Sequence, residues 1–69
     1  MNYIIYKQEP YSNHPSYHYL ERVLQFYKGK WITNLYSKVT GKHFQHRYFE
    51  KEEDSLKDFD NRKLEVTTL

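Results

Sequence analysis

The segment KGKWITNLYSKVTGKHFQHRYF, residues 28–49, dictates the architecture expected for this chain. Both of its halves are rich in β-branched and aromatic residues, and Thr40 and Gly41 lie between them. This pattern is typical of a β-hairpin, because glycine readily adopts the positive φ that a tight hairpin loop requires. The sequence therefore predicts two antiparallel strands, over 30–37 and 42–49.

Strand alternation predicts which side chains share a face of this hairpin. Successive residues of a strand point to opposite faces, so a loop over 39–42 fixes how the two strands face each other. One face is expected to hold Trp31, Thr33, Leu35, Phe44, His46 and Tyr48. The opposite face is expected to hold Ile32, Asn34, Tyr36, Gln45, Arg47 and Phe49.

The N-terminal part of the chain predicts a further strand, a loop and one ambiguous element. Residues 2–7 indicate a strand, and the prolines within residues 8–16 indicate an internal loop. Residues 17–28 place their apolar side chains on one half of a helix, with Ser16 as its N-cap, which favours a helix. A strand over 20–27 is the alternative, although adjacent apolar pairs break its alternation.

The C-terminal part predicts a second helix, over residues 50–61. Acidic residues crowd its first turns, where the helix dipole favours negative charge. Leu56 and Phe59 form a narrow apolar stripe that is expected to pack on the hairpin. Asp58 and Arg62 have the spacing of an ion pair across one helical turn. The residues after this helix, 64–68, are compatible with a short closing strand.

Length and composition limit the class of protein. A chain of 69 residues is expected to form a single domain, 1–69, and most of its aromatic residues, 19% of the chain, are expected to lie in the core. The predicted class is α+β, a small antiparallel sheet around the central hairpin with one or two helices packed on one face. No apolar run has the length of a signal peptide or a membrane span, so a cytoplasmic protein without membrane contact is expected.

Charge divides the chain into a basic and an acidic part. Residues 28–49 carry five Lys or Arg and no acid, whereas residues 50–60 carry six acids and two lysines. Cations contact phosphates and exposed rings stack on unpaired bases, so the basic aromatic hairpin predicts nucleic-acid binding, to DNA or RNA. The candidate nucleic-acid-binding residues are Lys28, Lys30, Trp31, Tyr36, Lys38, Lys42, His43 and Arg47.

A second function class uses other parts of the same surface. Aromatic side chains are enriched at protein interfaces, and an acidic helix complements a basic partner. The alternative prediction is therefore a protein-binding inhibitor or adaptor, of a phage or mobile-element type, acting through its tyrosine-rich surface or its acidic helix. Its candidate contact residues on that helix are Glu50, Glu53, Asp54 and Asp58.

Catalytic and metal-binding patterns are not found in the sequence. Its Ser, His and Asp residues form no recognisable catalytic arrangement, so we expect a protein that is not an enzyme and needs no cofactor. There is no Cys and no four-ligand spacing of the kind that binds zinc. His43 and His46, three apart on one strand, are expected on opposite faces, which argues against a shared metal ion.

One resemblance connects the basic hairpin to DNA. Its motifs are GKW at 29–31, TGK at 40–42, Phe49 and the acidic segment around Leu56. Together they resemble the small three-stranded-sheet-plus-helix DNA-binding domain of phage-type integrases, whose sheet lies in the DNA major groove. The resemblance covers residues 20–60, implies a strand over 20–27, and departs from the family in being rich in tyrosine. In composition the chain also resembles small phage-encoded proteins that bind host factors.

Overall fold

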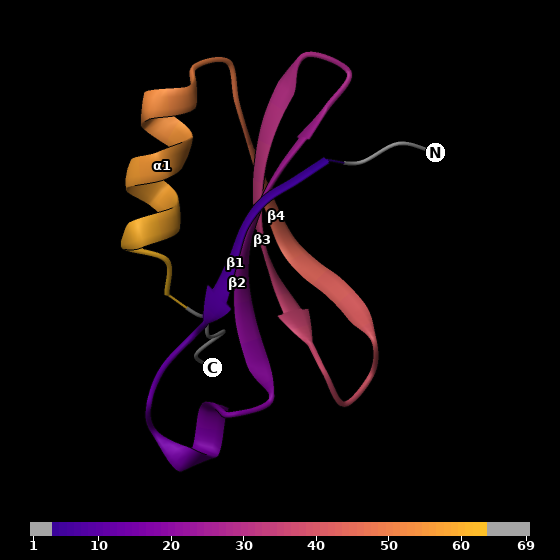
Figure 1. Ribbon diagram of the computed structural model, residues 1–69, viewed down its shortest axis with the longest axis vertical. Coiled ribbons are helices and arrows are strands. Elements are labelled where there is room, and N and C mark those ends of the chain that lie inside the picture. The colour runs from indigo at the N-terminus through magenta and orange to yellow at the C-terminus, as the bar shows by residue number, and fades with distance from the viewer. Residues whose placement is uncertain (1–3, 64–69) are drawn as a thin grey trace, which may run out of the picture.

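The computed structural model describes residues 4–63 and contains one antiparallel sheet and one α-helix. The four strands follow one another in the order β1-β2-β3-β4, and the helix α1 lies along one face of the twisted sheet (Figure 1). The bounds of the elements are β1 Ile4–Pro10, β2 Leu20–Tyr27, β3 Lys30–Ser37, β4 Lys42–Phe49 and α1 Glu52–Asp60, with a short 3-10 turn, η1, at Pro15–Tyr17.

The predicted strands over 30–37 and 42–49 are confirmed as β3 and β4, and they pair antiparallel. Gly41 has φ 72° in the loop between them, the conformation for which glycine was expected there. The hairpin is not central, however. β4 is an edge strand, and the two inner strands are β2 and β3.

The prediction of a helix over 17–28 is wrong, because residues Leu20–Tyr27 form the inner strand β2. Leu20, Arg22 and Leu24 alternate toward α1, with Arg22 between two apolar residues. The guanidinium of Arg22 donates to the backbone oxygens of Phe59 and Asp60, at the end of α1. Hydrogen bonds of this kind allow a cation to occupy a core-facing position.

The broken alternation of β2 has a tertiary cause. Val23 and Leu24 point to opposite faces of the sheet, yet they are 0% and 1% exposed. An inner strand that carries buried apolar residues on both of its sides loses the period of two that identifies a half-buried strand. The same loss of period produced the false helical pattern.

The edge strand β1 is longer at its C-terminal end than expected. It runs from Ile4 to Pro10, so residues 8–10 belong to the strand and not to the predicted loop. Proline is tolerated at this position because the outer side of an edge strand needs no backbone N–H for pairing. Tyr6 lies at an irregularity in the pairing between Ile5 and Lys7.

A bulge in β4 makes the predicted face assignment wrong for half of that strand. Leu35 is opposite Phe44, as expected, but the pairing then shifts by one residue, and Thr33 is opposite Arg47. Gln45, with φ 54°, lies at this shift. An extra residue in one strand exchanges the faces of every residue beyond it. His46 and Tyr48 are therefore on the face away from α1, while Arg47 and Phe49 are on the face toward it.

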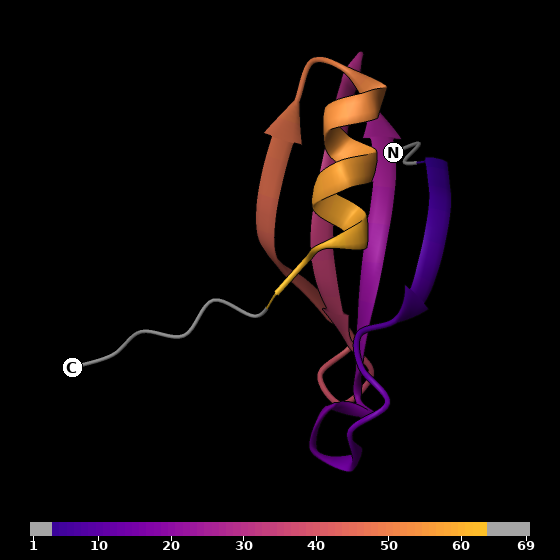
Figure 2. The ribbon, with the colours of Figure 1, turned by 90° about the vertical axis from the view of Figure 1, so that its left-hand side faces the viewer.

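The helix α1 begins and ends within the predicted range 50–61 and contacts β2, β3 and β4 (Figure 2). Phe59 is fully buried and Leu56 is half-buried. The ring of Phe59 also lies 4.9 Å from the guanidinium carbon of Arg22, so α1 packs on more of the sheet than the predicted hairpin. The predicted pair between Asp58 and Arg62 is confirmed, at 3.1 Å.

The structure does not test the predicted closing strand, and it contains no membrane-spanning helix in the described residues. The closing strand that the sequence suggested over 64–68 lies outside the described residues. Within residues 4–63, the helical segments are too short and too polar to cross a membrane.

Candidate functional site

The sheet has one face that α1 does not cover, which we call the open face. Aromatic and imidazole rings from three strands lie on it: Tyr27, Tyr36, His43, His46 and Tyr48. The ring centroids of Tyr36 and His43 are 4.8 Å apart, and those of His46 and Tyr48 are 6.5 Å apart in a stacked arrangement. Tyr48 is 65% exposed. The open face therefore presents a row of rings along β3 and β4.

The layer beneath these rings is buried. Val23 and Ile32 are buried although no described element covers this side of the sheet. Asn34 is also fully buried, and its amide nitrogen donates to Gln25 Oε1. The larger side chains of the open face close over this layer, so a ligand on the face would meet the rings and not the strand backbone.

His43 is held in a partly desolvated position on the open face. Burial lowers the pKa of His43 below its ordinary value, and the charge that His46 can carry lowers it further. Nδ1 of His43 lies 2.7 Å from Asn34 Oδ1. His43 is therefore neutral at neutral pH and has a fixed ring orientation.

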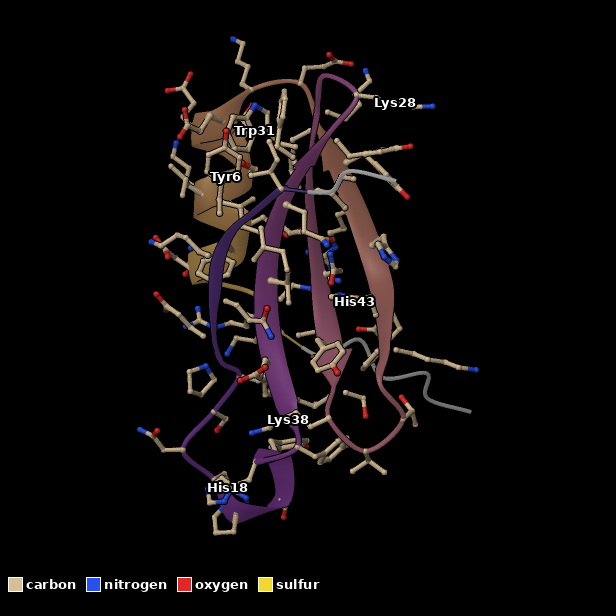
Figure 3. All side chains as sticks on the ribbon, turned by 45° about the vertical axis from the view of Figure 1, so that its right-hand side comes forward. Tyr6, His18, Lys28, Trp31, Lys38 and His43 are labelled. Carbon is tan, nitrogen blue, oxygen red and sulfur yellow. The ribbon has the colours of Figure 1, made fainter. Side chains whose placement is uncertain are left out.

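The lysines of the predicted binding surface lie at the two ends of the sheet. Lys28 lies in the turn between β2 and β3, and Lys38 lies at the opposite end, with His43 between them along the sheet (Figure 3). Lys42, opposite Ser37, is at the same end as Lys38. Lys30 is on the open face beside Lys28 and forms an exposed ion pair with Glu50. The cations thus flank the rings and do not run along them.

The centre of the open face is close to electrically neutral. Its acidic residue near Tyr36 is Glu21, directly opposite it in the register, and the Glu21 carboxylate accepts a hydrogen bond from Gln8. The nearest lysine on the face, Lys30, is paired with Glu50 at the end of the sheet. Rings dominate the middle of this surface, and charge dominates its rim.

Three of the predicted binding residues lie on the other side of the sheet: Trp31, Arg47 and Lys42, which is paired with Ser37. Trp31 faces α1, with the rings of Tyr6 and Phe26 each 4.8 Å from it (Figure 3). Arg47 also faces α1 and donates to Asp58 Oδ1 at 2.7 Å. Trp31 and Arg47 therefore belong to the packing between sheet and helix, on the face opposite Tyr36 and His43.

The acids of the alternative surface are divided in a similar way. Glu50 is exposed just before α1, and Glu53 and Asp54 are exposed in its first turn, whereas Asp58 is turned toward the sheet. Burial by itself raises the pKa of Asp58, but hydrogen bonds from Thr33, Arg47 and Arg62 outweigh it and the pKa is lowered. Asp58 is an internal anion that joins α1 to the sheet.

A metal ion has few ligands available on this surface. The bulge at Gln45 places His43 and His46 on the same face, which corrects the expectation that they point apart. Within residues 4–63, no group of three or more His, Cys, Asp or Glu side chains is arranged to hold a metal ion.

A shallow hollow of about 160 Å³ is lined by Lys30, Tyr48, Phe49 and Glu50, and it is smaller than a typical small-molecule pocket.

Sequence reasoning omitted His46 and Tyr48 from the candidate site and gave Asn34 no role. The position of the first two depends on the bulge, for which the local sequence carries no signal. Asn34 does carry one, because an asparagine in the middle of an apolar strand must either face solvent or find a hydrogen-bonding partner.

Comparisons of this chain with protein-family models, with curated proteins and with solved structures found no match.

Proposed function

We propose that this protein is a non-enzymatic module that binds single-stranded nucleic acid on the open face of its sheet. The observation that carries the proposal is the ring row on a face that α1 leaves uncovered. Bases stack on aromatic side chains regardless of sequence, and each stacked base contributes about 1–3 kcal/mol. Tyr48, which is 65% exposed, and Tyr36 are the stacking residues of this proposal.

Phosphate contacts come from the lysines at the rim. A nucleic-acid strand crossing the row of rings would run from Lys28 and Lys30 at one end of the sheet toward Lys38 at the other. Figure 3 shows Lys28 and Lys38 at these two ends. The ion pair between Lys30 and Glu50 is exposed, and such pairs contribute little and exchange readily for a phosphate. Trp31 and Arg47, which face α1, are not part of the proposed contact.

The resemblance to integrase-type DNA-binding domains supports duplex DNA as a second candidate ligand of the open face. That resemblance requires a strand over 20–27 and a sheet with one face available to DNA. β2 supplies this strand and α1 leaves the open face uncovered, although β1 adds a fourth strand that the family lacks, so duplex DNA belongs in the same test. A duplex ligand would lie against the sheet through its phosphates, whereas a single strand would also engage the rings.

The test is a binding titration by fluorescence anisotropy against single-stranded DNA, RNA and duplex DNA of about eight nucleotides or base pairs. Two or three lysine contacts predict that the logarithm of the association constant falls against the logarithm of salt with a slope of about −1.5 to −2. Tyr48→Ala should weaken single-strand binding by about 5- to 150-fold, because it removes one stacking ring. Its effect on the fold should be small, since Tyr48 is exposed.

The lysine test has a matched control. Replacing Lys28 and Lys38 together with alanine should flatten the salt slope by about 1.4, because each phosphate contact accounts for about 0.7. Lys51, at the N-cap of α1, and Lys57, within the helix, are both exposed. Replacing these two with alanine removes the same charge away from the open face, and the salt slope should stay unchanged. If both pairs of replacements flattened the salt slope equally, the effect would come from net charge and not from contacts on the open face. Absence of binding at low salt would overturn the proposal.

A protein-binding role remains the second candidate. The exposed acids Glu52, Glu53 and Asp54 lie together in the first turn of α1, unlike the internal Asp58. A basic partner would lose affinity when Glu53 and Asp54 are replaced by lysine, and Tyr48→Ala would have no effect on it. These two variants therefore distinguish the acidic helix from the open face.

A further inference from the structure

A chain of hydrogen bonds runs beneath the rings of the open face and ends at His43. Asn34 Nδ2 donates to Gln25 Oε1 at 2.6 Å, and Asn34 Oδ1 lies 2.7 Å from His43 Nδ1. The chain crosses three adjacent strands, since Gln25 is on β2, Asn34 on β3 and His43 on β4. Gln25 and Asn34 are both buried, so this polar chain is enclosed by the protein.

The direction of this chain decides which tautomer His43 adopts. An amide group donates through its nitrogen and accepts through its oxygen. Because Asn34 uses its nitrogen toward Gln25, its oxygen faces His43 and accepts a hydrogen bond. Nδ1 of His43 must then carry the proton, and Nε2 of the neutral ring is left with a lone pair.

The surroundings keep His43 in this neutral form. Its side chain is half-buried, and burial together with His46 lowers its pKa. No hydrogen bond to Nε2 is found from any other side chain in residues 4–63. Tyr36, whose ring lies 4.8 Å from that of His43, provides a stacking surface beside this acceptor. The open face thus combines a ring for stacking with a hydrogen-bond acceptor of fixed orientation.

We infer that His43 is the base-reading residue of the open face, accepting at Nε2 a hydrogen bond from the exocyclic amino group of a base stacked on Tyr36. The inference rests on the proposed function and names its preferred ligand. Adenine and cytosine carry an exocyclic amino group, whereas thymine has a carbonyl oxygen at the corresponding position, which repels a lone pair. Single strands containing adenine or cytosine are therefore preferred over oligothymidylate.

The experiment compares two oligonucleotides that differ in one amino group. Each is an oligothymidylate of about eight nucleotides, with either adenine or unsubstituted purine at its centre. The two bases stack through the same ring system, so a difference in affinity reports the amino group. The wild-type protein should bind the adenine oligonucleotide about 3- to 10-fold more tightly, the range of one net hydrogen bond.

Variants identify the acceptor. His43→Phe keeps an aromatic ring beside Tyr36 and removes Nε2, so it should bind both oligonucleotides equally. His46→Phe keeps a ring in the same row and leaves the hydrogen-bond chain intact, so any change in affinity should be the same for both oligonucleotides and the preference should remain. Discrimination that survives in His43→Phe, or is lost only in His46→Phe, would overturn the assignment.

A measurement without any ligand tests the premise on the wild-type chain. Long-range ¹H–¹⁵N correlation spectra should show the His43 proton on Nδ1, and a proton on Nε2 would overturn the inference. Equal wild-type affinity for the two oligonucleotides would overturn the inference and leave the proposed function standing. Absence of binding to both would overturn the proposed function itself, and the base-reading role with it.

Discussion

Asp58→Asn is the substitution that the packing of α1 makes most informative. The carboxylate of Asp58 is 16% exposed and accepts hydrogen bonds from Thr33, Arg47 and Arg62. Arg62 is 1% exposed at its side chain, and its second terminal nitrogen donates to the backbone oxygen of Gln45, at the bulge. Removing the negative charge leaves a buried guanidinium without its counter-ion.

The expected cost is large relative to the stability of so small a domain. Breaking one side of a buried ion pair costs about 3–5 kcal/mol, and the partial exposure of Asp58 reduces this to about 2–4 kcal/mol. Arg62 Nε is already buried without a hydrogen-bonding partner in the described part of the chain. The guanidinium therefore has few other contacts to offset the loss of the Asp58 carboxylate. A domain of 69 residues has a total stability of about 3–10 kcal/mol. The substitution therefore removes a large share of it.

The assay is urea unfolding followed by circular dichroism, with a thermal scan beside it. A loss of about 3 kcal/mol lowers Tm by about 12–24 °C in a domain of this size. Asp54→Asn is the matched control, because Asp54 is exposed in the first turn of the same helix. Its loss of a favourable dipole interaction should cost about 0.3–1 kcal/mol. Equal destabilisation by the two substitutions would refute the role assigned to Asp58.

The pH dependence of stability provides a second test of the contribution of the Asp58 carboxylate. The folded state holds the pKa of Asp58 below its unfolded value, because the hydrogen bonds outweigh the effect of burial. Its contribution is therefore complete above the unfolded pKa of about 3.9 and is lost as pH falls through the lower folded pKa. Wild type should lose more stability than Asp58→Asn across this acidic window. Parallel curves for the two proteins would contradict the mechanism.

Three further predictions concern the turn, the ring cluster and the histidine pair. Lys28 and Gly29 both have positive φ, so Lys28→Asn should raise the free energy of unfolding by about 0.5–1 kcal/mol in urea, because asparagine tolerates this conformation better. Trp31→Ala should cost about 2–4 kcal/mol of stability, measured in the same way, because Trp31 packs between two rings on the α1 side. An NMR titration should give His43 a pKa below its ordinary value. His46→Gln should raise the pKa of His43 toward that value without reaching it, because burial still lowers it. Stability from neutral His43 is therefore present above its unfolded pKa and is lost as pH falls toward the lower folded pKa.

The sequence by itself determined the elements whose signals are local. The β3–β4 hairpin follows from β-branched and aromatic runs around a glycine turn, and both of its strands occupy the predicted residues. Helix α1 follows from acids in its first turns, and the spacing of Asp58 and Arg62 correctly indicated their ion pair. These features depend on residues within a few positions of one another, so local sequence is sufficient to specify them.

Tertiary structure alone decided the remainder. β2 is a strand because it is buried on both faces and because Arg22 finds acceptors at the distant end of α1. The bulge at Gln45 brings His46 and Tyr48 onto the open face, and the Gln45 backbone oxygen is bound by Arg62 from beyond the helix. Such contacts join residues far apart in the chain, and their energies outweigh the weak preferences that a local pattern records.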